Sequence, residues 1–501
     1  MLPTLNLSIT SVGALGAIVY LAIRTIYRIY FHPLRRIPGP KLAAASHVLE
    51  FYYDIIKGGK YIFEVERMHK KYGPIVRINP RQVHISDPEF YDEIYTSAAR
   101  PRDKDVYATA RLGSPHFRRR ILNNFFSKQS VLSLEPLIQE KVTKLADYFE
   151  QTFHAGTVVR LNHTLAAFTS DVIAHYCYGE SYNYLDALAE PNHLKDGLGG
   201  LLLLVHVFYF FPFLPTVFAS IPLWLTGMIS PAMKALASFQ IKIHQQSTEA
   251  LAASAAQGTQ KEKDSRAKTM FDALADPALP AKERTIERLT DEGVIVLGAG
   301  SETTANNMAL CLYHLSENAS VMRKLRDELK QVMPTPTSTP SWTELENLPY
   351  FNGVINEALR LAIGGSWRLP RIPTQEALCY KNHLIPQGTP VIISQYFMHM
   401  NPDVFPEPSK FDPERWIKAA ANGDNLGKYL VPFHRGTRNC IGLNLAYAEL
   451  YLGVATIARR FDLEVTDTTI DNVTLARDYG VPHSEKGAWD VKVRVRNVVK
   501  V

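Results

Sequence analysis

The sequence predicts a mainly α-helical domain with small β-sheets, preceded by an apolar N-terminal helix. Long stretches of the chain repeat apolar residues with helical periodicity, whereas runs rich in β-branched residues are short and isolated. Strands and helices do not alternate as in a Rossmann domain, and no glycine-rich phosphate loop follows a strand. A nucleotide cofactor is therefore expected to bind on a partner protein and not on this chain.

Individual elements can be placed by their periodicity. The expected helices cover residues 134–152, 232–254, 285–316, 320–332, 350–361 and 441–459. The expected strands cover residues 74–79, 82–86, 390–394 and 489–496. Polar stretches rich in helix-breaking residues predict loops at 255–268, 333–341 and 420–428.

Composition narrows the class of protein. The 501 residues are 46% hydrophobic and 10% aromatic, which is enough for a deep core and argues against global disorder. A net charge of +6 without a long run of like sign suits an acidic partner or a membrane, and falls short of a nucleic-acid-binding signature. The four cysteines form no C-x-x-C pair, which favours a reducing compartment over a disulfide framework or a thiolate zinc site.

The N-terminus carries a candidate membrane anchor. The segment from Leu5 to Ile23 is almost wholly apolar and about long enough to cross a bilayer, and basic residues follow it but do not precede it. This asymmetry predicts a lumenal N-terminus and a cytosolic body. A cleaved signal peptide is the alternative, but it would normally begin with basic residues and have a shorter apolar core. We expect an anchor at 1–31, a hinge rich in proline and glycine at 32–44, and a catalytic domain at 45–501.

A second apolar stretch, residues 201–225, also has the length of a membrane span. Pro212, Pro215 and Pro222 would each remove a helix hydrogen bond, and a second crossing would place the C-terminal half in the lumen. We therefore expect a hairpin, broken by proline, that dips into the membrane surface.

The stretch FHRGTRNCIG, residues 433–442, distinguishes Cys440 from Cys177, Cys311 and Cys379, which we expect to be buried, inert small hydrophobic residues. Arg435 and Arg438 precede Cys440 and an apolar helix follows it, and both features favour the thiolate. Gly436 and Gly442 permit a tight turn. A thiolate here is either a nucleophile, with His434 as its base, or a ligand to a metal that another group mainly holds, as porphyrin holds haem iron.

Four motifs together resemble the cytochromes P-450. Phe433, Gly436, Arg438, Cys440 and Gly442 match the spacing of that family's haem-binding loop. The stretch AGSETT at 299–304 is similar to its oxygen-binding helix motif, and NEALR and FDPERW follow in the required order. The resemblance extends over nearly the whole chain. The overall sequence pattern resembles fungal secondary-metabolite members of the trichodiene-oxygenase type.

The resemblance implies a fold in which haem lies between a long distal helix and a proximal cysteine loop. It implies that Cys440 binds the iron of haem b and that Phe433, Gly436 and Gly442 shape the loop. It assigns proton delivery to Glu302 and Thr303, with Thr304 pointing elsewhere because successive helical residues differ by about 100°. The resemblance also implies that Arg438, Arg371 and Arg120 contact the haem propionates, and that His116 stands where the family has a tryptophan for this purpose. It further implies a buried network of Glu357, Arg360 and Arg415.

The glycines of the AGSETT helix have two interpretations. Gly298 and Gly300 each cost roughly 1 kcal/mol relative to alanine within a helix. They either form a packing notch for another helix or leave space for a ligand. The resemblance further implies a substrate pocket drawn from Val294, Leu297, Ala299, Ile363, Leu369, Tyr479 and Val481.

The implied activity is that of a monooxygenase dependent on NADPH and O₂, which hydroxylates or epoxidises a lipophilic terpenoid or polyketide. Electrons would come from a membrane-bound NADPH–cytochrome P-450 reductase, with a small haem electron carrier as a further possible partner. Arg118, Arg119 and Arg435 would meet the reductase's acidic surface. The expected location is the endoplasmic reticulum membrane, with a single span and a cytosolic catalytic domain. Alternatives are a haem-thiolate isomerase or dehydratase, a haem sensor, and a cysteine hydrolase.

Overall fold

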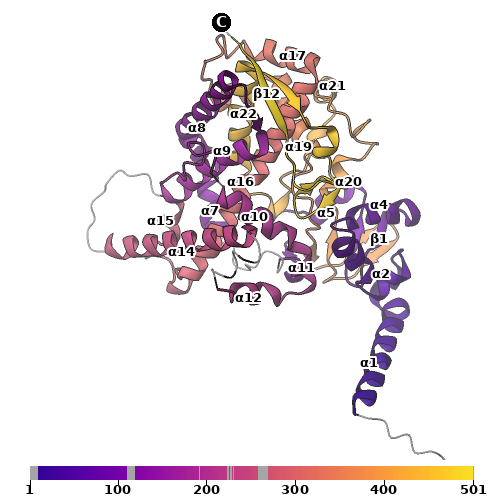
Figure 1. Ribbon diagram of the computed structural model, residues 1–501. Helices are drawn as coiled ribbons and strands as arrows, with labels where there is room; N and C mark the ends of the chain where they lie inside the picture. The colour runs from indigo at the N-terminus through magenta and orange to yellow at the C-terminus, as the bar shows by residue number, and fades with distance from the viewer. Residues whose placement is uncertain are drawn as a thin grey trace, which may run out of the picture. The chain divides into compact units, whose positions relative to one another are not determined.

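The computed structural model describes residues 9–109, 119–190, 192–222, 225, 228, 231–257 and 269–499. These residues form two compact units. The first comprises the described parts of Met1–Ala108, Arg368–Phe397 and Arg435–Thr437, and the second those of Thr109–Trp367, Met398–His434 and Arg438–Val501. Figure 1 labels many of the helices of both units and, among the strands, β1 and β12.

The first unit begins with α1 (Ile9–Ile26), an apolar helix whose side chains are exposed almost throughout. It continues through a π-turn, Tyr27–Phe31, and ends before Pro33, which cannot donate a helix hydrogen bond. Over Thr10–Phe31 this is the one helix of the described residues that is long and apolar enough to cross a membrane. Its position agrees with the predicted anchor.

The rest of the first unit is a small mixed sheet with short helices. The strand order is β1 (Ile75–Arg77), β2 (Val83–Ile85), β8 (Val391–Ile392), β5 (Arg371–Pro373) and β3 (Arg102–Lys104). All neighbouring strands are antiparallel except β2 and β8, which pair Val83 with Val391 in parallel. A separate hairpin joins β6 (Leu378–Tyr380) to β7 (His383–Ile385). The first unit also contains several short helices: α2 (Lys41–Ala45), α3 (Val48–Phe51), η3 (Tyr52–Ile56), α4 (Tyr61–Tyr72), η4 (Pro88–Phe90), α5 (Tyr91–Ile94) and the greater part of α6 (Val106–Thr109).

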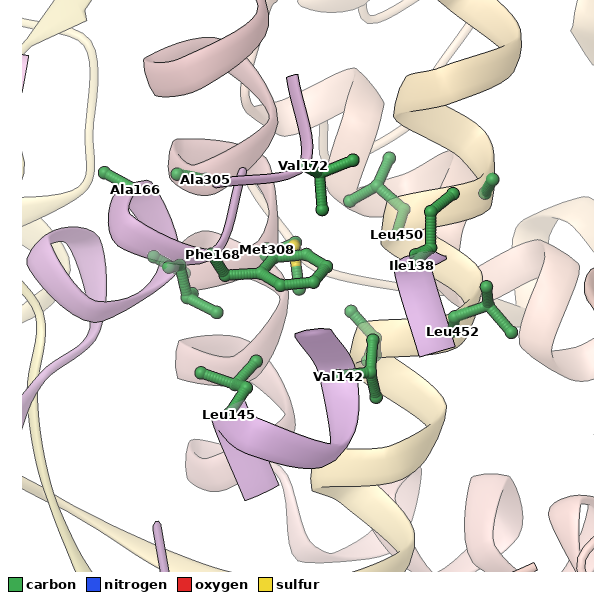
Figure 2. Packing of buried hydrophobic residues seen from close by; sticks show 14 of the residues in the cluster. Ile138, Val142, Leu145, Ala166, Phe168, Val172, Ala305, Met308, Leu450 and Leu452 are labelled. Carbon is green, nitrogen blue, oxygen red and sulfur yellow. The ribbon is translucent and has the colours of Figure 1, made fainter. Parts of the chain in front are cut away.

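The core of the second unit is built on four long helices. They are α8 (Lys128–Ala155), α9 (Leu161–Tyr178), α16 (Ile286–Glu317) and α22 (Leu443–Arg460), and α16 packs against both α9 and α22. Figure 2 shows their side chains meeting: Ile138, Val142 and Leu145 from α8, Ala166, Phe168 and Val172 from α9, Ala305 and Met308 from α16, and Leu450 and Leu452 from α22. These side chains are almost fully buried. Close packing of this kind makes α16 and α22 rigid supports for the side chains that they carry.

Shorter elements surround these helices. The further helices are α7 (Arg119–Phe125), α10 (His193–Leu203), α11 (Val205–Phe210), α12 (Leu214–Ala219), α14 (Pro231–Gln257), α15 (Met270–Leu274), η6 (Ala281–Glu283), α17 (Ala319–Leu329), α18 (Trp342–Glu346), α19 (Pro349–Leu361), α21 (Glu414–Asn422), η7 (Leu426–Lys428) and η9 (Ile470–Asn472). Three of the described helices include residues of both units, namely α6, α20 (Gln395–His399) and η8 (Gly436–Arg438). One antiparallel sheet has the order β4 (Val158–Arg160), β12 (Lys492–Val498), β9 (Phe461–Thr466), and a small ladder joins β10 (Arg477–Asp478) to β11 (Pro482–His483).

The fold-class prediction is confirmed, since long helices dominate and the sheets are small. All six expected helices are present, and the expected strands correspond to β1, β2, β8 and β12. The periodicity missed α9, because that helix is buried on nearly every side and therefore lacks a polar face. Residues 255–257 complete α14, and 258–268 lie outside the described residues.

The apolar stretch 201–225 does not form one long helix. It contains the end of α10 and the short helices α11 and α12. The breaks coincide with the prolines, since α11 ends two residues before Pro212 and Pro215 lies in the first turn of α12. Leu203, Phe213 and Val217 are half exposed or more, which leaves the predicted membrane-dipping role as a proposal.

Candidate active site

The loop that carries Cys440 is held by tight turns. The backbone N–H of Cys440 donates to the carbonyl of Phe433, with a nitrogen–oxygen distance of 2.7 Å. Gly436 has a φ of +72°, and a Cβ there would lie 2.7 Å from the carbonyl oxygen of Tyr95 and closer still to that of Thr96. Glycine is therefore required at position 436 by both conformation and space. His434 adopts a φ of +54°, which is uncommon for a residue with a side chain.

Cys440 opens onto a cavity between α16 and α22. The empty space of this cavity, counted together with the part that is open to solvent, is about 550 Å³. Its wall is mostly hydrocarbon, with a few polar groups. The lining consists of Phe126, Ile173, Ile295, Val296, Ala299, Gly300, Thr303, Thr304, Phe433, Cys440, Ile441, Gly442, Leu445, Ala446 and Glu449. Such a wall favours an apolar ligand.

One face of α16 forms the wall opposite α22. Ile295, Ala299 and Thr303 line it at intervals of four residues, which places them on one side of the helix. Of the predicted substrate contacts on this helix, Ala299 lines the cavity, whereas Val294 and Leu297 do not. Leu297 lies on the opposite side of the helix and is fully buried in the core.

In the AGSETT segment the structure contradicts the expectation for Thr304 and decides between the two interpretations of the glycines. Thr304 was expected to point elsewhere, but it lines the cavity together with Thr303. The glycines serve helix packing, because a Cβ on Gly298 would lie 2.8 Å from Leu198 and one on Gly300 would lie 2.9 Å from Ile173. Gly300 also lines the cavity, so the packing notch and the ligand space coincide at that residue.

Glu302 lies beside the cavity lining but does not contribute to it. Its carboxyl group is buried and hydrogen-bonds with Asn306, which in turn accepts a hydrogen bond from Asn162 on α9. Burial, more than any neighbouring charge, raises the pKa of Glu302 above its usual range. The acid and the alcohol predicted to act together are thus adjacent in sequence but face different surroundings.

Glu449 is a functional candidate that our sequence reasoning missed. It lies on α22, is 1% exposed, lines the cavity and shares a hydrogen bond with Thr304. Burial raises the pKa of its carboxyl group well above the usual value, and the Thr304 hydroxyl opposes this shift. The signal was available, because this acid falls within the apolar run of residues 441–459, four residues after the buried Leu445.

The structure brings Glu357, Arg360 and Arg415 together in one buried network. Arg360 donates to both oxygens of Glu357, at 3.0 and 2.7 Å, and Arg415 donates to the same carboxylate at 3.0 Å. The indole N–H of Trp416 and the backbone N–H of Asp412 complete the set, at 2.9 and 3.0 Å. The network ties α19 to the FDPERW segment.

The four predicted contacts to haem propionates have different surroundings. In the first unit, Arg371 is buried, donates to the carbonyls of Leu369 and Pro370, and lies 5.2 Å from the ring centre of Tyr95. In the second unit, Arg438 is exposed. The side chain of Arg120 and all of His116 lie outside the described residues.

The cations proposed to meet a reductase are only partly described. Arg435 forms an ion pair with Asp92 at 3.1 Å within the first unit. Arg118 and the side chain of Arg119 lie outside the described residues.

The remaining predicted substrate contacts do not line this cavity. Ile363 is buried with a φ of +62°, and the carbonyl of Leu369 accepts a hydrogen bond from the side-chain hydroxyl of Tyr95 at 3.2 Å. Tyr479 and Val481 flank the turn between β10 and β11, where the Tyr479 N–H donates to the Val481 carbonyl at 3.3 Å. Periodicity could not place these residues, because each belongs to a loop or a loop edge.

The other cysteines differ from Cys440. Cys177 and Cys311 are buried, and burial raises the pKa of both thiols, in agreement with inert packing residues. Cys379 is exposed on β6, where the burial of alternate residues turns its side chain outward. The expectation that Cys379 is buried is therefore wrong.

The cavity fits the haem that the resemblance implies. Cys440 offers one thiol to an otherwise hydrocarbon wall, which suits an iron held mainly by a planar apolar ring. Gly442 lines the cavity, and no atom lies within 4 Å of the position that its Cβ would occupy. A larger side chain at Gly442 would therefore project into the space the ring needs.

Comparisons with known proteins agree with this arrangement. Residues 46–484 match the family model described as Cytochrome P450. The chain is 41% identical to "Cytochrome P450 monooxygenase aflU" of Aspergillus parasiticus, covering 96% of this chain and 97% of the relative. It is 40% identical to "Cytochrome P450 monooxygenase TRI4" of Fusarium sporotrichioides, with coverage of 97% and 95%, and 44% identical to "Conidiogenone synthase PchP450" of Penicillium rubens, with coverage of 94% and 96%. A crystal structure of "a Cytochrome P450 (CYP102L1)" matches with a TM-score of 0.68 at 18% identity, over 87% of this chain and 94% of that one.

Proposed function

The chain belongs to the cytochrome P450 family and is a monooxygenase with a cysteine-ligated haem, and from this premise we propose that it oxidises a lipophilic small molecule of terpenoid or polyketide type. The observation that carries the proposal is Cys440 at the wall of an apolar cavity that also presents two threonine hydroxyls. Hydrocarbon walls favour an apolar substrate, because burying apolar surface is the main favourable term in binding. The fungal relatives support the substrate class.

The cysteine loop prepares the thiol for its role as an iron ligand. Gly436 permits the turn, the Phe433 carbonyl holds the Cys440 backbone, and the start of α22 follows directly. The partial positive charge of a helix N-terminus favours the thiolate. When bound, haem supplies the reductive activation of O₂, which thiolate ligation promotes. Arg371, Arg438 and Arg120, with His116, are proposed to neutralise its propionates.

Proton supply in this proposal rests on α16. Thr303 presents its hydroxyl to the cavity and also donates to the Ala299 carbonyl at 2.8 Å, which fixes its rotamer. Thr303 would hold a water molecule in hydrogen-bonding position. Glu302, whose pKa burial raises, would exchange protons with that water after a side-chain rotation away from Asn306.

The proposal includes a membrane-bound electron donor. We propose that α1 anchors the chain in the endoplasmic reticulum membrane and that the catalytic residues face the cytosol. Electrons would come from NADPH through a flavoprotein reductase in the same membrane, with a small haem electron carrier as a second donor. The excess of basic residues in the chain suits an acidic partner surface.

The experiment that tests the proposal is the ferrous–CO spectrum of Cys440→Ala, compared with wild type. We expect wild type to show the strongly red-shifted Soret band of thiolate ligation, and Cys440→Ala to lose both that band and NADPH-dependent turnover. Cys177→Ala and Cys379→Ala are matched controls, since one thiol is buried and the other exposed, and neither lines the cavity. A normal CO spectrum in Cys440→Ala would refute the assignment.

A further inference from the structure

The inference concerns Glu449, an acid that the proposed function above does not use. Its side chain lies at the wall of the Cys440 cavity, on the helix that begins just after the cysteine loop. It is nine residues beyond Cys440 and belongs to a different helix from the Glu302–Thr303 pair. A buried carboxyl group in an apolar wall is costly unless it is neutral or well hydrogen-bonded.

Glu449 has few partners for a buried acid. Among the described residues no cation pairs with it, and the Thr304 hydroxyl is its hydrogen-bond partner through one oxygen. The other oxygen, Oε1, is buried without a partner among the described residues. A carboxylate in that position would keep an uncompensated charge, whereas a carboxylic acid carries a hydroxyl that can donate to Thr304 or toward the cavity.

The surroundings contain little that could stabilise a charge. Besides Cys440, Glu449 is the one side chain of the described lining with an ordinarily acidic proton, and its neighbours on α22, Leu445 and Ala446, are apolar. From α16, the groups that reach this wall are hydrocarbon or hydroxyl. Burial accordingly raises the pKa of Glu449 well above its usual value.

We propose that Glu449 is a neutral carboxylic acid that stores one proton in the cavity and exchanges it through the Thr304 hydroxyl, as a second acid–alcohol pair beside Glu302–Thr303. In the exchange, Glu449 gives its proton to the Thr304 oxygen while Thr304 releases its own hydroxyl proton toward the cavity. One proton moves in total, Thr304 is unchanged, and Glu449 is left as a carboxylate. A water molecule at the open side of the cavity accepts the released proton as a hydronium ion, and a hydronium ion from the solvent later restores the proton of Glu449. The consequence for catalysis rests on the proposed function, whereas the protonation state does not.

The two pairs differ in their structural relation to the cavity. Thr303 and Thr304 both line it, but Glu302 does not, and its carboxyl group is hydrogen-bonded to Asn306. Glu449 and Thr304, in contrast, both line the cavity, and the Thr304 hydroxyl contributes a hydrogen bond to the Glu449 carboxyl group. In the Glu449–Thr304 pair, therefore, both the acid and the alcohol belong to the cavity wall.

The first test is infrared spectroscopy of the resting, haem-loaded, full-length protein at neutral pH, without turnover. The spectrum of wild type minus Glu449→Gln should contain the carbonyl stretch of a protonated carboxylic acid, and this band should shift in D₂O. Thr304→Val should move the band to higher frequency because it removes the hydrogen bond, whereas Thr303→Val should not. The proposal would be overturned if the band were absent, or if Thr304→Val left its frequency unchanged.

The second test measures the fraction of NADPH electrons recovered in oxidised product. Glu449→Gln keeps the shape of the side chain and a hydrogen bond to Thr304 but cannot give up a proton. We expect this fraction to fall several-fold while NADPH is still consumed, less than the roughly 100-fold effect of a general acid because water replaces part of the function. Glu449→Asp should recover part of the loss. Unchanged coupling in Glu449→Gln would also overturn the proposal.

A ferrous–CO spectrum of each variant separates the two proposals. If the variants and wild type all retain the red-shifted band, a failure of the infrared or coupling test refutes only the role of Glu449. If wild type itself lacks the band, the proposed function fails, and the infrared result still reports the protonation state of Glu449.

Discussion

The buried carboxylate of Glu357 gives the sharpest stability prediction. It accepts five hydrogen bonds, two from Arg360, one from Arg415, one from Trp416 and one from the backbone of Asp412. Glu357→Ala would leave the guanidinium of Arg360, which is 0% exposed, without its anionic partner. Breaking a buried ion pair in this way costs about 3–5 kcal/mol.

The donors that are left behind add to that loss. An unsatisfied buried N–H costs about 1–3 kcal/mol, and both Trp416 and Asp412 would lose their acceptor. Since neighbouring effects are not additive, we expect a total of about 4–7 kcal/mol for Glu357→Ala. Glu357→Gln, which keeps the shape and one oxygen acceptor but loses the charge, should have a smaller effect.

The assay is urea unfolding followed by far-ultraviolet circular dichroism, together with the amount of haem retained after purification. Glu414→Ala is the matched control, because Glu414 pairs with Lys324 at the surface near the same network. An exposed pair of this kind contributes only about 0–1 kcal/mol. If Glu357→Ala and Glu414→Ala lowered the free energy of unfolding equally, the network would not hold α19 to the FDPERW segment as argued.

Three further predictions follow from other parts of the molecule. Gly436→Ala should lose haem, because a Cβ at this position would collide with the backbone. Gly423 has a similar φ of +77° but no atom within 4 Å of its Cβ position, so Gly423→Ala should retain haem. Equal haem contents in the two variants would refute the steric argument. Burial, aided by the charge of Arg360, lowers the pKa of His314 from 6.5 to about 4, so His314 stays neutral in the fold. The free energy of unfolding should therefore fall by roughly 3 kcal/mol as the pH drops from 6.5 toward 4, because of this group. His314→Phe keeps the stacking on Phe411 but cannot take up a proton. This variant should therefore flatten that part of the curve of unfolding free energy against pH. Deletion of residues 1–31 should remove the main membrane anchor and leave haem binding intact. The truncated protein should still bind weakly to liposomes at low salt through residues 201–225. If it did not bind liposomes at all, the membrane-dipping role of 201–225 would be refuted.

The sequence by itself determined the features that depend on local pattern. Helical periodicity located the long helices α8, α14, α16 and α22, because an amphipathic helix repeats its apolar residues every 3.6 positions. The cations, the glycines and the start of a helix around Cys440 distinguished it before any contact was known. The resemblance to the cytochromes P-450 implied the network of Glu357, Arg360 and Arg415, which the structure brings together.

Only the tertiary structure decided which faces of the buried helices meet the cavity. In α9 and in the middle of α16, buried residues, apolar and polar, occur on nearly every side of the helix, so no sequence pattern distinguishes a face that meets the core from one that meets a ligand. Packing placed Leu297 in the core and Thr304 at the cavity, and it brought Glu449 of α22 to Thr304 of α16. These two residues are 145 positions apart, and their contact depends on how the two helices pack, which no local pattern encodes.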